Sequence, residues 1–428
     1  MAQTQKLEKK NRVDWVMLIV VALLVGFGLL MVYSASSYEA QIKWDSALYF
    51  VKKQAIAVVI GLVGLAAAAL IPVDFWKSRV SYIVYILAFG ATLMVLSPIG
   101  IESNGARRWI DLKVMTLQPA EFLKVGVILV TAALIVRFRK KLGTVLGFIL
   151  AVLPVLAAAF IVATVTDDLG TAMIIFAMGI IMIFIAAPKR KYVVALVAVI
   201  VAAGLVFVFS KSYRLTRIKA WLNLEAYADS DGYQPLQALY AIASGGLTGK
   251  GLGKSTQKLG FIPESENDMI FSIICEELGV LGGIGLMVLI IFLLWRMYRI
   301  YRSTDDMFSK LVVAGVIGHI GTQTFLNTGV VSSLLPNTGV PLPFISYGGS
   351  SIMMLLIEIG LVVSVSRRKS VPAKAAAGTV KAGAGGGTET LSGINGEVHQ
   401  QTKTGKIKKV KKPRVVREDK RKGVIYYR

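Results

Sequence analysis

Long runs of apolar residues, separated by short polar stretches, recur along the chain. Each run is about 20 residues long, which is the length of α-helix that crosses the hydrocarbon core of a bilayer. The pattern therefore predicts ten transmembrane helices. We expect them at residues 14–35, 48–71, 79–97, 118–136, 145–164, 168–187, 192–210, 268–295, 309–329 and 349–366.

Composition supports a membrane protein, because 55% of the 428 residues are hydrophobic and only 17% are charged. A soluble enzyme is excluded, since water could not solvate that much apolar surface. No small-residue cleavage site follows the first run, so we expect a retained helix and not a signal peptide. The only cysteine, Cys275, is expected to be a small buried hydrophobe. The predicted fold class is an all-α polytopic membrane protein with a long extracytoplasmic loop between spans seven and eight.

Basic residues indicate the orientation of these spans. Lysine and arginine cluster in segments that fall on one side of a ten-span arrangement, at residues 6–12, 77–79, 137–141, 189–191, 296–302 and 367–369. Short loops rich in lysine and arginine favour the cytoplasmic side of a membrane. We therefore expect both termini in the cytoplasm, and the loops at 36–47, 98–117, 211–267 and 330–348 outside.

Three regions follow from these patterns: a cytoplasmic segment 1–13, a membrane domain 14–366 and a tail 367–428. The tail carries 17 lysine and arginine residues against four acidic ones, so it contributes +13 of the formal net charge of +23. A segment of this composition cannot bury a core, and we expect it to be disordered. Anionic membrane lipids are its expected partner, and no nucleic acid is expected. Protein docking is the alternative.

Two charged residues lie within the fourth predicted span. Pro119 suits the first turn of a helix, and Glu121 and Lys124 lie three residues apart on one face of it. They form either an ion pair near the interface or the charged lining of a water-filled cavity, which the cost of charge in lipid favours. Just before them, the segment Arg107–Trp109 is either an interfacial anchor or a site for a phosphate.

The predicted loop 211–267 has 57 residues, too many for a simple connector. Its first part, SYRLTRIKAWLNL, has apolar residues at helical spacing, which predicts a helix lying in the membrane interface. Further on, GGLTGKGLGKSTQK combines glycine turns with Lys250, Lys254 and Lys258. Such turns can hold phosphates through backbone N–H groups, but this is not a nucleotide-binding motif.

Asp268 stands directly before the eighth predicted span, where an aspartate is a favoured helix N-cap or a candidate catalytic group. Asp168 is in a similar position before the sixth span. Glu276 and Glu277 lie about two turns, or roughly 12 Å, deeper than Asp268, and at least one should face the bundle interior. The last outward loop ends in PLPFISYGGSS, and such irregular backbone is tolerated in a membrane only where it lines a cavity or packs on protein.

Together these segments resemble the SEDS family (shape, elongation, division and sporulation), whose members include FtsW, RodA and SpoVE. The resemblance covers residues 14–366 and rests on motifs that occur in the family's order: SNGARRWI, LQPAEFLK, DLGTA, GGLTGKGLG, IPESENDMIF with EELG, and PLPFISYGGSS. It implies a ten-span helical fold and polymerisation of lipid II into glycan strands at the outer face of the bacterial cytoplasmic membrane. The chain departs from the family at Ala120, where serine is usual, and around Asp268, which is flanked by Asn267 and Met269.

The resemblance also implies site residues. The family's catalytic aspartate falls on Asp268, and its cavity glutamate and lysine fall on Glu121 and Lys124. Cations are needed beside the pyrophosphate leaving group, and Lys124 and Arg108 are candidates. Other substrate-binding residues are expected in the two loops that would shape the channel: Lys250, Lys254, Pro343, Ser346, Gly348 and Gly349. No cofactor is expected with certainty, and a divalent cation, Mg²⁺ or Mn²⁺, stays an alternative although no ligand motif is present.

Two further functions fit the same features: a flippase for lipid-linked precursors, and a non-enzymatic scaffold that recruits a penicillin-binding protein. As an enzyme, the chain is expected to work with a class B penicillin-binding protein and other cell-wall synthesis or division proteins. The long basic tail favours a role in division, nearer to FtsW than to the elongation or sporulation members.

Overall fold

The computed structural model describes residues 13–103, 106–111, 116–209 and 212–367, and four short stretches of the tail at 399–401, 407–409, 415–419 and 424–427. The chain forms two separate units, Met1–Lys369 and Ser370–Arg428. The expectations for the rest of segments 1–13 and 367–428, including disorder of the tail, lie outside the described residues.

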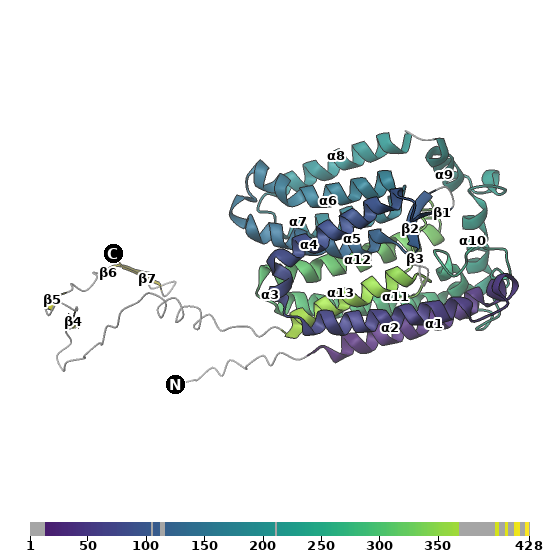
Figure 1. The fold of residues 1–428 in the computed structure, drawn as a ribbon, viewed down its shortest axis with the longest axis horizontal. Helices are drawn as coiled ribbons and strands as arrows, with labels where there is room; N and C mark the ends of the chain where they lie inside the picture. Colours follow the sequence, from purple (N-terminus) through teal and green to yellow (C-terminus); the bar gives the residue numbers. More distant parts are fainter. Residues whose placement is uncertain are drawn as a thin grey trace. The chain divides into compact units, whose positions relative to one another are not determined.

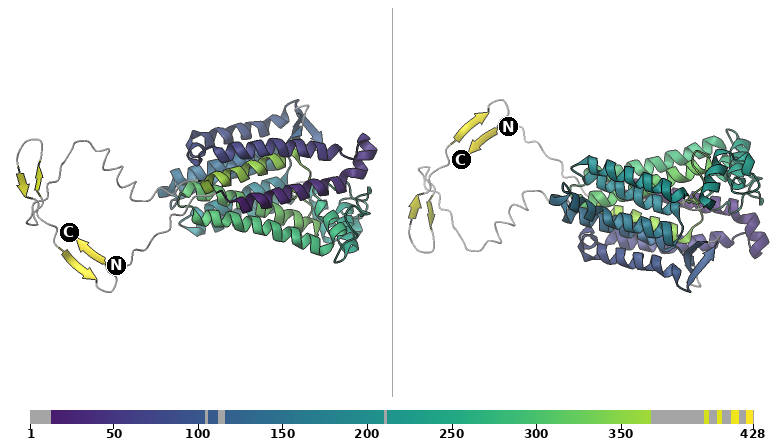
Figure 2. Two further views of the ribbon diagram at one scale, coloured as in Figure 1. Left: turned by 90° about the horizontal axis from the view of Figure 1, so that it is seen from below. Right: turned by 90° about the horizontal axis from the view of Figure 1, so that it is seen from above.

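The first unit is a bundle of long, roughly parallel helices (Figures 1 and 2). Helices occur in all ten predicted ranges. Among the described residues, eight spans are long and apolar enough to cross a membrane: α1 (Trp15–Trp44), α2 (Tyr49–Leu70), the span Val73–Leu96, α5 (Pro119–Arg137), α6 (Val145–Val165), α7 (Leu169–Ala186), α11 (Ile270–Ser303) and α13 (Gly349–Arg367). The other two predicted ranges hold α8 (Arg190–Phe209) and α12 (Met307–Val331). The polytopic helical fold is therefore confirmed.

The span Val73–Leu96 is not one regular helix. It comprises α3 (Val73–Phe75), a π-helical turn at Trp76–Val80, α4 (Ser81–Leu93) and a 3₁₀ turn at Met94–Leu96. A further 3₁₀ turn follows α5 at Arg139–Lys141.

Helices α5 and α13 lie at the centre of the bundle. In the most apolar stretch of each helix, 83% and 78% of the residues are buried. The corresponding share in the span Val73–Leu96 is 22%, so most of that span's surface is available to contact lipid. Helix α13 packs along α2, and α12 packs along both α7 and α5. Polar groups on the facing sides of α5, α12 and α13 are consequently enclosed by protein.

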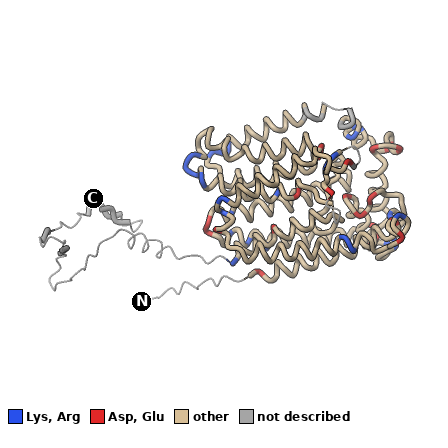
Figure 3. The backbone as a smooth tube through the Cα atoms, in the orientation of Figure 1, with Lys and Arg blue, Asp and Glu red and all other residues tan. Residues whose placement is uncertain are grey.

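The two ends of the bundle differ in charge. Lysine and arginine predominate in the loops at the end where α1 begins and α13 ends, although acidic residues lie there too, and the opposite end carries both signs (Figure 3). That opposite end holds α9 (Ser212–Leu222), a 3₁₀ turn at Glu225–Tyr227 and α10 (Tyr233–Gly245) (Figure 1). The helix predicted in the segment SYRLTRIKAWLNL is confirmed as α9.

A small antiparallel sheet at the same end was not predicted. Its strands are β1 (Gly100–Ser103), β2 (Ala106–Asp111) and β3 (Thr116–Leu117), with β2 in the middle. Ile101 pairs with Trp109 and Ile110 with Leu117, so the sheet connects the end of the third span to the start of α5. The second unit contains two short antiparallel pairs, β4 (His399–Gln401) with β5 (Ile407–Lys409) and β6 (Val415–Asp419) with β7 (Val424–Tyr427).

Candidate active site

Asp268 lies at the N-terminal end of α11, two residues before the helix begins. The N-cap residue is Met269, and no side chain caps it, so the interpretation of Asp268 as a helix cap is wrong. The backbone carbonyl of Asp268 accepts a hydrogen bond of 2.6 Å from the side-chain amide of Asn327 on α12. This bond fixes the main chain of Asp268 and does not involve its carboxylate.

Burial raises the pKa of the Asp268 carboxyl from its ordinary 3.8 to about 6. The negative charge of Glu264 raises this pKa further, whereas Arg217 and the backbone N–H groups of Asp268 and Met269 oppose the rise. A carboxylate with a pKa near 6 is still mostly ionised at neutral pH and is a much stronger base than an ordinary aspartate.

Glu266 is a second unusual carboxylate in the same loop. It is 2% exposed, and burial raises its pKa to about 7. Its other charged neighbours are Glu39, Glu264 and Lys43, whereas Arg217 acts on Asp268. The two carboxyl groups with raised pKa values therefore share Glu264 as a neighbour and differ in the nearby cation, which is Lys43 for Glu266 and Arg217 for Asp268.

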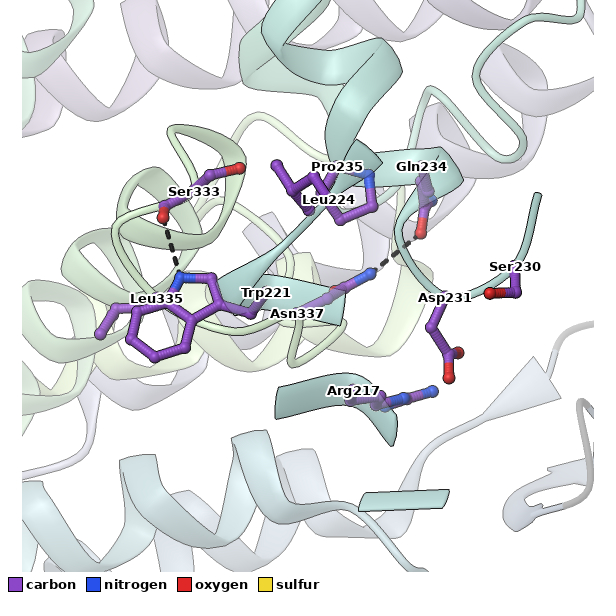
Figure 4. A pocket seen from close by; sticks show the side chains of 10 residues that line it. All are labelled: Arg217, Trp221, Leu224, Ser230, Asp231, Gln234, Pro235, Ser333, Leu335 and Asn337. Carbon is purple, nitrogen blue, oxygen red and sulfur yellow. Dashed lines mark hydrogen bonds between the residues drawn. The ribbon is translucent and has the colours of Figure 1, made fainter. Parts of the chain in front are cut away.

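A cavity of about 160 Å³ lies beside this loop (Figure 4). It is bordered by α9, the start of α10 and the segment 333–337, and Arg217 is one of its lining residues. Trp221 donates from its indole nitrogen to the Ser333 carbonyl at 2.9 Å, and Asn337 donates to the Gln234 side-chain oxygen at 3.1 Å. The amide of Gln234 in turn donates to the carbonyl of Pro263 at 3.2 Å. The cavity is thus lined by an aromatic ring, two side-chain amides and the cation Arg217. The charge of Arg217 also acts on Asp268.

Glu121 and Lys124 form an ion pair of 2.8 Å inside the bundle. Pro119 begins α5 as predicted, and the two side chains are only 2% and 1% exposed. Lys124 also donates to the Gln323 side-chain oxygen at 3.2 Å. The pairing of the two residues is confirmed, and protein encloses them in this state, so the water-filled cavity expected around them stays a prediction.

The segment PLPFISYGG is held from several sides. Ser346 accepts a hydrogen bond from the backbone N–H of Leu342 at 2.8 Å, and Pro343 is buried. Gln54 on α2 donates to the Ser346 carbonyl at 3.3 Å and accepts from the N–H of Gly348 at 3.0 Å. The N–H of Tyr347 donates to the carbonyl of Glu266 at 2.8 Å. Gly349 begins α13. This segment therefore packs directly against the loop that carries Asp268.

Comparison with known proteins agrees with this geometry. Residues 14–371 match the family model of FtsW, RodA and SpoVE, described as cell cycle proteins. The chain belongs to this family. Stage V sporulation protein E of Bacillus subtilis is 36% identical to it over 84% of this chain and 98% of that protein. The probable peptidoglycan glycosyltransferases FtsW of Geobacter sp. and of Bacillus subtilis are 33% and 34% identical, over 83% and 82% of this chain and 97% and 90% of those proteins. Sporulation and division members thus match to similar degrees.

Two solved structures share this SEDS fold. One is a chain of a peptidoglycan synthase complex that coordinates polymerization and crosslinking, with a TM-score of 0.69 and 26% identity over 83% of this chain and 98% of that chain. The other is the rod shape determining protein RodA of Thermus thermophilus, with a TM-score of 0.60 and 26% identity over 84% of this chain and 98% of that chain.

Two lysines of the glycine-rich loop, Lys250 and Lys258, form ion pairs with glutamates of α11. Lys250 pairs with Glu276 at 2.6 Å, and Lys258 pairs with Glu277 at 2.7 Å. Both glutamates are fully buried, which confirms that they face the interior. Lys254 is exposed. A role for Lys250 and Lys254 in substrate binding stays a prediction.

The same loop fills a break in α11. Gly279 has φ 73° and ψ −179°, so the predicted continuous helix is wrong at this point. Backbone N–H groups of Lys250 and Gly251 donate to the carbonyls of Glu276 and Glu277 at 3.0 and 2.9 Å. Those of Val280 and Leu281 donate to Gly246 and Leu247 at 2.9 and 3.2 Å. Polar backbone freed by the break is thereby satisfied within the protein.

Two residues near the small sheet have contacts within the protein. Arg108 donates to the carbonyls of Thr166 and Asp167 at 3.1 and 2.8 Å, at the end of α6. Its predicted role as a cation for the pyrophosphate stays a prediction. Asp168 accepts from the N–H of Thr171 at 2.9 Å, which confirms it as the cap of α7.

Sequence reasoning missed Gln54, His319, Gln323, Asn327 and Glu358. Three of them lie four residues apart in the predicted span 309–329, a polar spacing that could have marked a buried face of α12. Within the described ranges, three or more His, Cys, Asp or Glu side chains do not come together as a metal site. No set of described residues is therefore assigned to a divalent cation.

Proposed function

We propose that this peptidoglycan glycosyltransferase of the SEDS family polymerises lipid II, with Asp268 as the general base. The observation that carries the proposal is the Asp268 carboxylate, whose pKa burial raises to about 6 and which is influenced by the charge of Arg217, a lining residue of the cavity that also contains Trp221, Gln234 and Asn337. An aromatic ring with amide groups is a suitable lining for a sugar. Close relatives named as probable peptidoglycan glycosyltransferases support the same reaction.

In this reaction a sugar hydroxyl attacks the anomeric carbon of a second, lipid-linked sugar. The new C–O bond forms as the bond to the lipid pyrophosphate breaks, and the hydroxyl proton passes to the Asp268 carboxylate. A pyrophosphate leaves without being protonated, so one base suffices, unlike the acid and base pair of glycosidases. With a pKa near 6, about 90% of Asp268 is ionised at pH 7 and ready to accept the proton.

Charge developing on the pyrophosphate requires cations aimed at it. Lys124, and Arg217 at the border of the cavity, are the positive groups that this proposal assigns. Lys124 is enclosed beside Glu121 in the structure, so the bundle must open toward it when substrate binds.

Orientation and partner belong to the same proposal. The end of the bundle with basic loops would lie in the cytoplasm with both termini, and Asp268 would face outward. A class B penicillin-binding protein, which crosslinks the strand, would contact the loop 211–267. Support comes from the structural similarity to a chain of a synthase complex that couples polymerization with crosslinking.

The test is a polymerisation assay with the purified full-length chain and labelled lipid II. The proposal expects glycan polymer from the wild type and none above background from Asp268→Asn. Transfer of lipid II across vesicles without polymer would instead indicate a flippase, and neither activity would indicate a scaffold. Either result would overturn the proposed function.

A further inference from the structure

A line of buried polar side chains runs along α12. His319, Gln323 and Asn327 are spaced four residues apart, so they share one face of the helix. We name these three residues the α12 polar stripe. All three are at most 1% exposed. Buried polar groups in a membrane helix are costly unless they are hydrogen-bonded, and each of these bonds to another part of the bundle.

The outermost residue of the stripe joins two loops. The Asn327 side-chain nitrogen donates to the carbonyl of Asp268 at 2.6 Å and to the carbonyl of Val340 at 2.8 Å. An amide nitrogen has two hydrogens, so both bonds form at once. Asn327 therefore ties the main chain of the proposed base to residue 340.

Gln323 makes the matching connection one turn deeper. Its side-chain nitrogen donates to the carbonyl of Pro341 at 3.0 Å. Because the nitrogen is the donor there, the side-chain oxygen is the acceptor for Lys124, at 3.2 Å. Residues 340 and 341 are thus held between the carbonyl of Asp268 and the ammonium group of Lys124.

His319 fixes Gln323 from the other side. Its Nε2 lies 2.8 Å from the Gln323 side-chain oxygen, and an acceptor there requires that Nε2 carry a hydrogen. Its Nδ1 lies 2.8 Å from a carboxylate oxygen of Glu358 on α13. A hydrogen bond between these two atoms requires one hydrogen, either on Nδ1 of His319 or on the carboxyl oxygen of Glu358. Glu358 therefore holds the ring in the one orientation in which Nε2 points at Gln323.

We propose that the α12 polar stripe, oriented by Glu358, is a positioning device that fixes the Val340–Pro341 segment and thereby sets Lys124 and Asp268 relative to each other. Asn327 contacts the main chain of Asp268 and Gln323 contacts the side chain of Lys124, whereas His319 acts through Gln323. A misplacement of about 1 Å between such groups is enough to slow a reaction by about a hundredfold. Each side chain of this network makes hydrogen bonds, although Asn327 Oδ1 and Glu358 Oε1 accept none from the described residues. A buried network of this kind favours one arrangement of a core.

The first test measures kcat and KM for lipid II with the purified full-length chain. The double variant His319→Leu/Glu358→Leu removes the donor to Gln323 together with its carboxylate partner, so no uncompensated buried charge remains. We expect kcat to fall about tenfold with KM changed less than about threefold, because alignment is lost and binding is kept. His319→Gln keeps an N–H donor and should recover most of the loss.

The matched control is Thr328→Val on the same helix, because among the described residues the Thr328 hydroxyl bonds to carbonyls of α12 alone. This variant should keep wild-type kinetics. A double variant that is as stable as this control and has the wild-type kcat would overturn the proposal, since the stripe would then serve stability alone.

A second measurement needs no lipid II and is independent of the proposed function. Thr338→Cys, in a Cys275→Ala background, places a thiol two residues before Val340. Breaking the stripe should make this thiol react at least about threefold faster with a water-soluble maleimide in membranes, because its segment opens more often. If the double variant does not fold, Gln323→Met removes the bond to Pro341 at similar volume. Unchanged labelling in a folded stripe variant would overturn the proposal.

Discussion

Replacing Asp268 by asparagine should stabilise the protein while it abolishes catalysis. Raising the pKa of this carboxyl from 3.8 to about 6 means that the fold disfavours its ionised form. Each factor of ten in the acid constant is worth about 1.36 kcal/mol, so the ionised carboxylate costs the folded state about 3 kcal/mol at neutral pH. Asparagine has the same shape and no charge, and the cost disappears with it.

The sign of the pH dependence follows from proton binding. Between pH 3.8 and about 6 the folded state holds the Asp268 proton more tightly than the unfolded state. The free energy of unfolding of the wild type therefore falls as pH rises through this window and stays lower above it. Asp268→Asn lacks this decrease. Glu266, with its pKa raised to about 7, contributes equally to both proteins and cancels in the comparison.

The assay is equilibrium unfolding of both proteins in detergent micelles at pH 7.5 and at pH 4. We expect Asp268→Asn to be more stable by about 3 kcal/mol at pH 7.5 and by less than about 1 kcal/mol at pH 4. Polymerisation by the variant should fall by a factor of about 100 or more, as expected for a lost general base. A wild type as stable as the variant at pH 7.5 would refute the reasoning, because the carboxylate would then be well solvated or paired.

Four further variants test other parts of the structure. Glu264→Gln should lower the pH midpoint of polymerisation and Arg217→Gln should raise it, each by about half a pH unit, because these charges act on Asp268 in opposite directions. Gly279→Ala should reduce the free energy of unfolding by about 3 kcal/mol, measured in the same micelles, since its φ of 73° disfavours alanine and a Cβ would lie 2.2 Å from the Leu247 carbonyl oxygen. Removing residues 370–428, a separate unit, should leave the polymerisation rate of the purified protein within about twofold.

The sequence was sufficient for features that depend on local patterns. Apolar runs predicted helices in all ten ranges, and helical spacing predicted α9. Local chemistry also identified Pro119 as the start of α5 and Asp168 as the cap of α7. In each case the residues that decide the structure lie within one turn of one another, so their spacing carries the information.

Features that depend on distant partners could not be predicted in this way. The break at Gly279 lies in an apolar run that is typical of a continuous helix, and it forms because the loop 246–251 satisfies the freed backbone. His319 and Glu358 are 39 residues apart and meet only because α12 and α13 pack together. The strands β1 and β2 have too short an alternation of apolar residues to be distinguished from a loop.

The structure also explains how the protein tolerates an unfavourable carboxylate at Asp268. The N–H groups of Asp268 and Met269 and the charge of Arg217 only partly offset the cost of burying the carboxylate, whereas several neighbours fix the main chain around it. Asn327 holds the carbonyl of Asp268 from α12. Two turns further along α11, Glu276 accepts hydrogen bonds from Lys250, Ser255 and Thr256, which tie the first segment of the helix to the glycine-rich loop. If these bonds supplied the carboxylate itself with donors, its pKa would fall and its basicity would be lost. Stabilising the backbone around Asp268 while leaving its side chain poorly solvated is the arrangement that keeps a strong base in place.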